Sequence, residues 1–190
     1  MLRTATPDDR PQIIELINQV AKEKRWLQTA RYEPSDSWEA LLSTGYDPDR
    51  GLWLQLLVED ERIVGFVRIF PDVSHTHSRP TGNIGIVLAS PYRSRGYGKL
   101  LLAHAIKMAP TMGFDYLRAA ILMHNIPSLR LFLKFDFQIK EIRTVLWPAR
   151  KIFCEEATVE KCLKPTSSKL SGGHIYGGGH PLFPDNQHIY

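Results

Sequence analysis

The most informative segment of the sequence is Ile84-Gly85-Ile86-Val87-Leu88-Ala89-Ser90-Pro91-Tyr92-Arg93-Ser94-Arg95-Gly96-Tyr97-Gly98-Lys99. Its apolar first part predicts a buried strand, and apolar residues three or four apart from Tyr97 onward predict a helix face. Glycines between a strand and a helix let the backbone turn tightly and approach a ligand closely. Free N–H groups and the dipole at the helix start favour an anion there. Because three basic side chains add positive charge, the sequence predicts a pyrophosphate site.

Two phosphate-binding motifs are excluded by residues in this loop and at the start of the helix that follows. A P-loop requires a glycine five residues before the Gly98-Lys99 pair and a serine or threonine after it, where the chain has Arg93 and Leu100. The dinucleotide-binding fingerprint requires a third glycine at the position of Leu101. The pattern that remains is Arg-x-x-Gly-x-Gly at residues 93–98.

This pattern resembles the acetyl-coenzyme A pyrophosphate loop of the GNAT superfamily of N-acetyltransferases. A second segment supports the resemblance, because Asn125 precedes a helix-forming stretch that ends in the aromatic pair Phe135 and Phe137. The expected order of elements also agrees with the family: a strand, two helices, three strands, a helix, a strand, a helix and two strands. The resemblance covers roughly Leu2 to Leu163.

The resemblance implies acetyl-CoA as co-substrate and a place for each of its parts. The pyrophosphate would lie on the amides of the loop, and the pantetheine arm would enter a gap between the strands at Ile84–Ala89 and Tyr116–Met123. Asn125 would hold that arm, and the Ser128–Phe132 face would lie near the thioester. The residues implied in coenzyme binding are Ile86, Val87, Leu88, Arg93, Ser94, Arg95, Gly96, Tyr97, Gly98, Lys99, Asn125, Ser128 and Phe132.

The other elements follow from periodicity and from capping and turn residues. Further strands are expected at Leu2–Thr6, Leu52–Val58, Ile63–Phe70, Phe137–Trp147 and Ile152–Leu163. Helices are expected from Pro7 to about Arg25, from Ser35 to a stop at Gly45, from Tyr97 to a kink or end at Pro110, and from Pro127 to Phe135. The predicted fold is α/β, with one mixed, mostly antiparallel central sheet and helices on both faces.

Composition places the chain among folded proteins of ordinary size. It has 190 residues, of which 43% are hydrophobic and 23% charged, so wholesale disorder is excluded and one domain is expected, at residues 1–164. Residues 165–190 hold five of the 13 glycines and three of the seven histidines without a hydrophobic period. We expect them to form an irregular Gly/His-rich C-terminal tail.

The same counts limit compartment and partners. No apolar run reaches the ~20 residues that cross a bilayer, and the chain starts too polar for a signal peptide. The two cysteines, Cys154 and Cys162, exclude a disulfide framework and a four-thiolate zinc site, so we expect a cytoplasmic protein without a metal. We also expect a monomer or homodimer. A net charge of +4 without a basic stripe or an RNA-binding sheet motif argues against nucleic acid.

The resemblance implies that an amine of a small molecule or peptide attacks the acetyl carbon directly, without a covalent enzyme intermediate. Many relatives use a glutamate on the fourth strand as base, but no carboxylate occurs from Pro80 to Tyr92. The remaining candidates for the base are His75, His77, Glu33 and Asp72. Aromatic residues in the region of the acceptor wall are Trp26, Tyr32, Trp38 and Trp53.

The leaving group raises an alternative to catalysis. Many relatives protonate the coenzyme thiolate from a tyrosine on the helix after the asparagine, and the matching position here is Phe132. A substituting acid such as Tyr97, a water, or unassisted departure of the thiolate would each serve an enzyme. A catalytically weak module that senses acyl-CoA is the alternative function.

Overall fold

The computed structural model describes residues 1–72 and 79–164. Two segments lie outside the described residues: 73–78, which contains His75 and His77, and 165–190, the predicted tail. The helices are α1 (Arg10–Lys22), α2 (Asp36–Thr44), α3 (Tyr97–Met108) and α4 (Ile126–Lys134), with 3-10 helices η1 (Pro7–Asp9), η2 (Ser90–Tyr92) and η3 (Ala109–Met112). The strands are β1 (Leu2–Thr4), β2 (Tyr46–Asp47), β3 (Leu52–Glu59), β4 (Arg62–Pro71), β5 (Thr81–Leu88), β6 (Tyr116–Leu122), β7 (Gln138–Trp147) and β8 (Ile152–Cys162).

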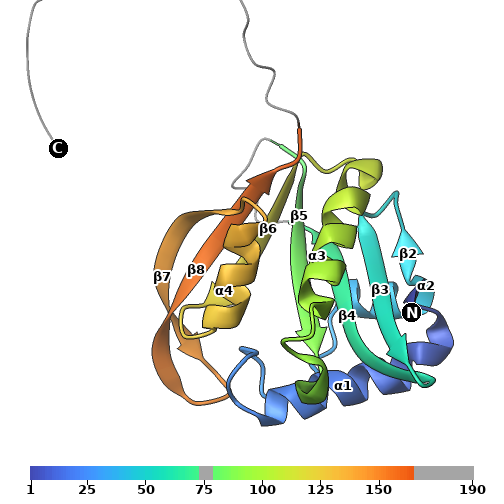
Figure 1. Ribbon diagram of the computed structural model, residues 1–190, viewed down its shortest axis with the longest axis horizontal. Helices are drawn as coiled ribbons and strands as arrows, with labels where there is room; N and C mark the ends of the chain where they lie inside the picture. Colours follow the sequence, from blue (N-terminus) through green and yellow to red (C-terminus); the bar gives the residue numbers. More distant parts are fainter. Residues whose placement is uncertain (73–78, 165–190) are drawn as a thin grey trace, which may run out of the picture.

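The strands form one sheet in the order β1-β3-β4-β5-β6-β8-β7, with β2 paired to β3 (Figure 1). The β5–β6 pair is parallel, and the other pairs among the described strands are antiparallel. The predicted fold class, a mixed and mostly antiparallel sheet with helices on both faces, is confirmed. The two-residue strand β2 was not predicted, because it is too short to carry a period.

Local signals in the sequence set the ends of the helices. The Ser35 hydroxyl caps α2 by accepting a hydrogen bond from the Trp38 amide at 3.3 Å. Gly45 ends α2 in the left-handed region at φ +68, where a Cβ would lie 1.9 Å from the Ala5 carbonyl oxygen. Helix α3 ends at Met108 and continues as η3 around Pro110, as the proline predicts.

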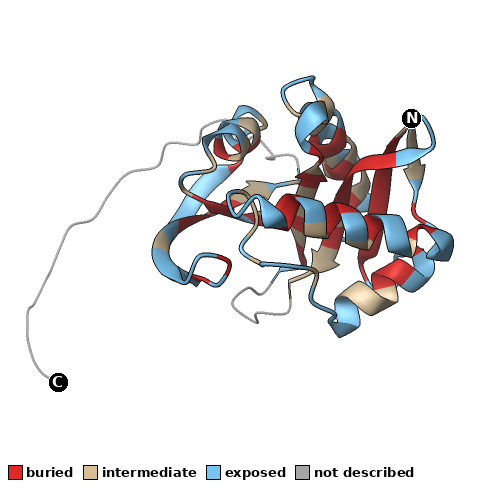
Figure 2. Ribbon diagram, turned by 90° about the horizontal axis from the view of Figure 1, so that it is seen from below, coloured by how far each residue is buried: buried red, intermediate tan, exposed pale blue. Residues whose placement is uncertain are grey.

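The sheet separates two hydrophobic cores. On one face, α1 and α2 bury apolar residues such as Ile13, Leu16 and Leu41 against the sheet. On the other face, α3 and α4 bury residues such as Leu101 and Leu129. Figure 2 shows the buried residues along the strands and on the helix sides that face them. Among the described residues, no helix is long and apolar enough to cross a membrane.

Strands β5 and β6 pair over only part of their length. Their register contains three pairs, Thr81 with Tyr116, Gly82 with Leu117 and Asn83 with Arg118. Beyond these pairs β5 stays with β4 and β6 stays with β8, so the facing edges of Ile84–Leu88 and Ala119–Leu122 are not paired with each other (Figure 1). We call this region the split. It confirms the predicted parting of the strands.

Ion pairs fasten the paired end of β5 and β6. The Arg118 side chain is 14% exposed, and it contacts the carboxylates of Asp72 and Glu160 at 2.8 Å each. These acids come from the end of β4 and from β8, on the two sides of the β5–β6 pair. Because buried charges need partners close by, this arrangement holds the two halves of the sheet together where the split begins.

Asp9 connects β1 to the start of α1. Its carboxylate accepts hydrogen bonds from the Arg3 guanidinium at 2.6 Å and from the Thr6 amide at 2.8 Å. The hydrogen bond from Arg3 is the main cause that lowers the pKa of Asp9 to about 2. Since the pKa in the unfolded chain is about 3.9, this stabilisation is fully present above that pH and is lost as the pH falls through about 2.

Asp9→Asn is therefore expected to lower the free energy of unfolding by about 2 kcal/mol near pH 6. The difference from the wild type should shrink as the pH approaches 2, because protonation then removes the carboxylate from the wild type as well. Urea unfolding at several pH values measures it, with the exposed neighbour Asp8→Asn as control. A difference that stays constant from pH 6 to pH 2 would contradict the assignment.

Candidate active site

Two cavities meet at the split. The loop-side groove, of about 550 Å³, runs along the loop at Arg93–Lys99 and along α4. The aromatic pocket, of about 500 Å³, lies among the α1–α2 loop, β4, β5 and β6. Both cavities share the lining residues Trp26, Leu27, Ile86, Val87, Asn125, Ser128 and Phe132. A ligand in the groove and another in the pocket would therefore approach each other at these residues.

The loop before α3 presents backbone donors to the groove. Gly96 lies in the left-handed region at φ +88, and a Cβ on it would meet no atom within 4 Å. Helix α3 begins at Tyr97 without a side-chain cap. Within the described residues, no backbone carbonyl accepts a hydrogen bond from the amides of residues 94–99. Several N–H groups and the helix dipole are thus available to one anion, as the motif predicts.

Arg93 ties the loop to its neighbours. Its guanidinium donates two hydrogen bonds to the Glu23 carboxylate, at 2.6 and 2.7 Å, and its Nε donates to the Leu88 carbonyl at 3.0 Å. The hydrogen bond from Arg93 is the main cause that lowers the pKa of Glu23. Arg93 also lies over the Trp26 ring at 5.3 Å. In this structure Arg93 therefore joins the end of α1, the loop and the end of β5.

The other charged and aromatic loop residues divide between the groove and the surface. Lys99 and Ser94 line the groove together with Arg93. Arg95 instead lies over the Tyr92 ring at 5.7 Å, and the Tyr97 hydroxyl hydrogen-bonds to Glu59. Arg95 and Tyr97 line neither cavity. The structure thus brings most of the predicted coenzyme-binding residues together at the groove, but not these two.

The exposed edge of β5 faces the groove and the pocket. Ile86 and Val87 line both cavities, and Leu88 lines the groove. Within the described residues, Ile84–Leu88 have no strand partner on the side of the split. The Leu88 carbonyl is the exception along this edge, because it accepts the hydrogen bond from Arg93.

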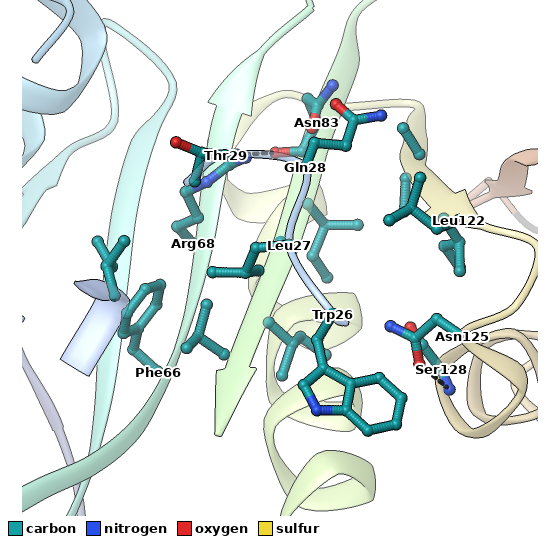
Figure 3. A pocket seen from close by; sticks show the side chains of 18 of the residues that line it. Trp26, Leu27, Gln28, Thr29, Phe66, Arg68, Asn83, Leu122, Asn125 and Ser128 are labelled. Atoms are coloured by element: carbon teal, nitrogen blue, oxygen red, sulfur yellow. Dashed lines mark hydrogen bonds between the residues drawn. The ribbon is translucent and has the colours of Figure 1, made fainter. Parts of the chain in front are cut away.

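Helix α4 closes the groove from the other side of the split. Asn125 caps this helix, since its side-chain oxygen accepts a hydrogen bond from the Ser128 amide at 3.3 Å. Phe132 is 3% exposed and packs edge-on against Phe137, with ring centroids 4.9 Å apart. Figure 3 shows Asn125 and Ser128 across the opening from Phe66 and Arg68. Asn125 is therefore a cap and a wall of both cavities.

The segment Arg25–Thr29, which we call the strap, bridges the split. The Arg25 carbonyl accepts from His124 Nε2 at 2.8 Å, and the Leu27 carbonyl accepts from Trp147 Nε1 at 2.9 Å. The Gln28 amide donates to Glu156, a carboxylate on β8 that is 1% exposed and also accepts two hydrogen bonds from Arg143. Figure 3 shows Trp26 and Leu27 of the strap beside the opening. The strap thereby helps to form both cavities.

Aromatic side chains form one wall of the aromatic pocket. Trp38 contacts Tyr32 and Phe66 edge-on, with ring centroids 5.9 and 6.0 Å apart. These three residues and Trp26 line the pocket, and Trp26, Tyr32 and Trp38 belong to the aromatic set that was expected at the acceptor wall. Trp53, from the same predicted set, is 2% exposed in the core beneath α3, where it stacks on His104. It has no place in the site.

Two charged side chains line the described part of this pocket, Glu33 and Arg68. Glu33 is exposed. The candidate base Asp72 lines neither cavity, because its carboxylate pairs with Arg118. The candidates His75 and His77 lie outside the described residues. Among the residues that are described, no three His, Cys, Asp or Glu side chains gather as metal ligands.

Arg68 was missed by sequence reasoning. It stands on β4 opposite Gly85, and its Nη1 donates a long hydrogen bond, 3.4 Å, to the Asn83 carbonyl. Desolvation by burial lowers the pKa of Arg68 to about 10, so the side chain is still charged at neutral pH. In the sequence, Arg68 is only a charged residue that interrupts an apolar strand. Its register with Gly85 and the lining of the pocket show where it lies.

Comparisons with known proteins agree with this geometry. A sequence model described as the acetyltransferase (GNAT) family matches residues 14–137. The "Putative phosphinothricin acetyltransferase YwnH" of Bacillus subtilis (strain 168) is 30% identical over 141 residues, which cover 72% of this chain and 82% of YwnH. L-ornithine N5-acetyltransferase NATA1 of Arabidopsis thaliana is 29% identical over 94 residues, which cover 49% of this chain and 41% of NATA1.

A solved structure shows the same fold. It is a GNAT superfamily phosphinothricin acetyltransferase from Sinorhizobium meliloti in complex with AcCoA, with a TM-score of 0.72 and 20% identity, covering 90% of this chain and 95% of that one. The family match spans more than half of the sequence and includes the loop, the split and α4. The chain therefore belongs to the GNAT family and is an acetyl-CoA-dependent acyltransferase.

Proposed function

We propose that this protein is an N-acetyltransferase that moves the acetyl group of acetyl-CoA to a primary amine of a small molecule or peptide. The observation that carries the proposal is the meeting of two cavities at shared residues of the split. One cavity has the features of a coenzyme groove, and the other is open to a second molecule. Such a site supports direct attack, because both reactants can be held in reach at once.

The groove fits acetyl-CoA, which supplies an acetyl group activated as a thioester. The amides of residues 94–99 and the start of α3 suit a pyrophosphate, and Lys99 adds positive charge. The unpaired edge at Ile86 and Val87 suits an amide-bearing arm, since an exposed strand edge offers hydrogen bonds to an extended chain. Asn125 and Ser128 would face the arm from α4.

The aromatic pocket would hold the acceptor amine. An amine attacks only in its neutral form, so the site must accept a proton. Glu33 is the carboxylate that lines the described part of the pocket, and we keep it as the candidate proton acceptor. Asp72 is engaged by Arg118 away from both cavities and is not retained.

The described residues would give the departing thiolate little general-acid assistance. Phe132 lines both cavities but has no proton to give, and the Tyr97 hydroxyl is bonded to Glu59 outside them. A thiol with a pKa near 8.5 leaves tolerably well as the anion, so transfer does not require a general acid. Phe132 would then serve as an apolar wall of the transfer site.

An amine panel with acetyl-CoA tests the proposal. The names of two relatives, YwnH and NATA1, put phosphinothricin and ornithine on the panel, beside polyamines and peptides with a free N-terminus. Release of coenzyme thiol should depend on both substrates, with intersecting lines in double-reciprocal plots, because both are bound before transfer. Tight binding of acetyl-CoA without turnover of any amine would favour the acyl-CoA sensor instead.

Phe132→Tyr is expected to release the coenzyme thiol about tenfold faster than the wild type does, because a positioned general acid contributes up to 10²–10⁴-fold. Single-turnover measurement of thiol release, with the acceptor at saturation, detects the change. Phe135→Tyr, an aromatic exchange on the same segment but outside both cavities, serves as control. An unchanged rate in folded Phe132→Tyr would show that no missing acid limits the reaction.

A further inference from the structure

Arg68 enters the aromatic pocket over a position that has no side chain. The register places Arg68 on β4 directly beside Gly85 on β5. A Cβ on Gly85 would come within 3.1 Å of the guanidinium carbon of Arg68. Because Gly85 has no side chain, the side chain of Arg68 can lie over β5 at this position. Figure 3 shows Arg68 at the side of the opening, near Asn83.

The guanidinium has no counterion among the described residues. Its one hydrogen bond there goes to the Asn83 carbonyl at 3.4 Å, although an arginine carries five N–H donors. Arg118, two strands away, instead contacts two carboxylates at 2.8 Å each. A desolvated charge is costly without a partner, so Arg68 is suited to receive one from outside the chain.

Two aromatic rings fix the orientation of Arg68. The guanidinium carbon lies 4.3 Å from the centroid of the Phe70 ring and 5.6 Å from that of Trp38. These contacts cover its face and favour its charge, while hydrogen-bond donors remain at its edge. A planar guanidinium with a free edge matches the two oxygens of a carboxylate.

We propose that the acceptor amine of this enzyme carries a carboxylate and that Arg68 binds it in the aromatic pocket. This inference rests on the proposed function and names its substrate class. Val87, which lines both cavities, lies two residues beyond Gly85 along β5, or about 6.6 Å. An amino acid with its carboxylate on Arg68 can direct its amine along β5 toward this shared lining.

The charges of the pocket agree with such a ligand. Arg68 and Glu33 are the charged side chains in its described lining, one of each sign. An amino acid is a zwitterion with the opposite pair of charges, so its net charge matches that of this lining. A diamine or polyamine would instead leave Arg68 unpaired and add a second positive charge beside it.

Matched acceptors test the inference in the full-length protein. Methionine and ornithine are compared with methioninamide and ornithinamide, which keep the amine and lose the carboxylate. With acetyl-CoA at saturation, the wild type should have a kcat/KM about 100-fold higher for the acid of a pair, the effect of a charge-assisted hydrogen-bonded pair. Arg68→Met should lose that preference, mainly through KM for the acid.

Three controls keep the outcome clear. Arg68→Lys retains the charge without the planar fork and should keep part of the preference. Arg62→Met removes an exposed arginine from the same strand and should leave both acceptor types unchanged. Calorimetric titration with acetyl-CoA reports whether each variant is folded with an intact groove.

The outcomes separate this inference from the proposed function. Equal kcat/KM for acids and amides in the wild type would overturn the inference and leave N-acetylation standing, as would an Arg68→Lys variant that loses acids and amides equally. Turnover of no amine in the wild type, with acetyl-CoA bound, would overturn the proposed function and the inference with it.

Discussion

Strands β5 and β6 share three residue pairs, and all of the candidate chemistry lies beyond the third. Beyond that pair β6 remains paired with β8 and β5 with β4, so each strand keeps its outer neighbour while the edges that face each other stay unpaired. Arg118 and its two carboxylates fix the point where the strands begin to part. A sheet that paired fully here would have no exposed edge for a coenzyme and no passage between the groove and the aromatic pocket.

The two sides of a sheet with such a gap need other hydrogen bonds that tie them together. The strap provides them, since its backbone carbonyls accept hydrogen bonds from Trp147 and His124, and Gln28 reaches the buried carboxylate of Glu156. Arg93 makes a second tie, from the loop to the end of α1. The hydrogen bonds of several polar groups around the site thus hold distant segments together. The same segments position the walls of both cavities.

The sequence predicts those parts of the site whose signals are local. Gly96 and Gly98 between a strand and a helix indicate the loop, and Asn125 before Pro127 indicates the cap of α4. The strap and Arg68 could not be predicted, because they act through contacts between distant segments. Nothing in the sequence near Gln28 indicates Glu156, and the role of Arg68 depends on its register with Gly85. Glu33 lines the pocket, whereas the carboxylate of Asp72 pairs with Arg118, a contact between distant segments that the sequence does not indicate.

The coenzyme is proposed to bind along the free edge of β5 within the split. Residue-resolved hydrogen exchange, with and without acetyl-CoA, tests it most directly. Backbone amides within Ile84–Leu88 and residues 94–99 should become protected when acetyl-CoA binds, while the β7–β8 hairpin should be unchanged. Protection confined to other parts of the sheet, under conditions where calorimetry shows that acetyl-CoA is bound, would contradict it.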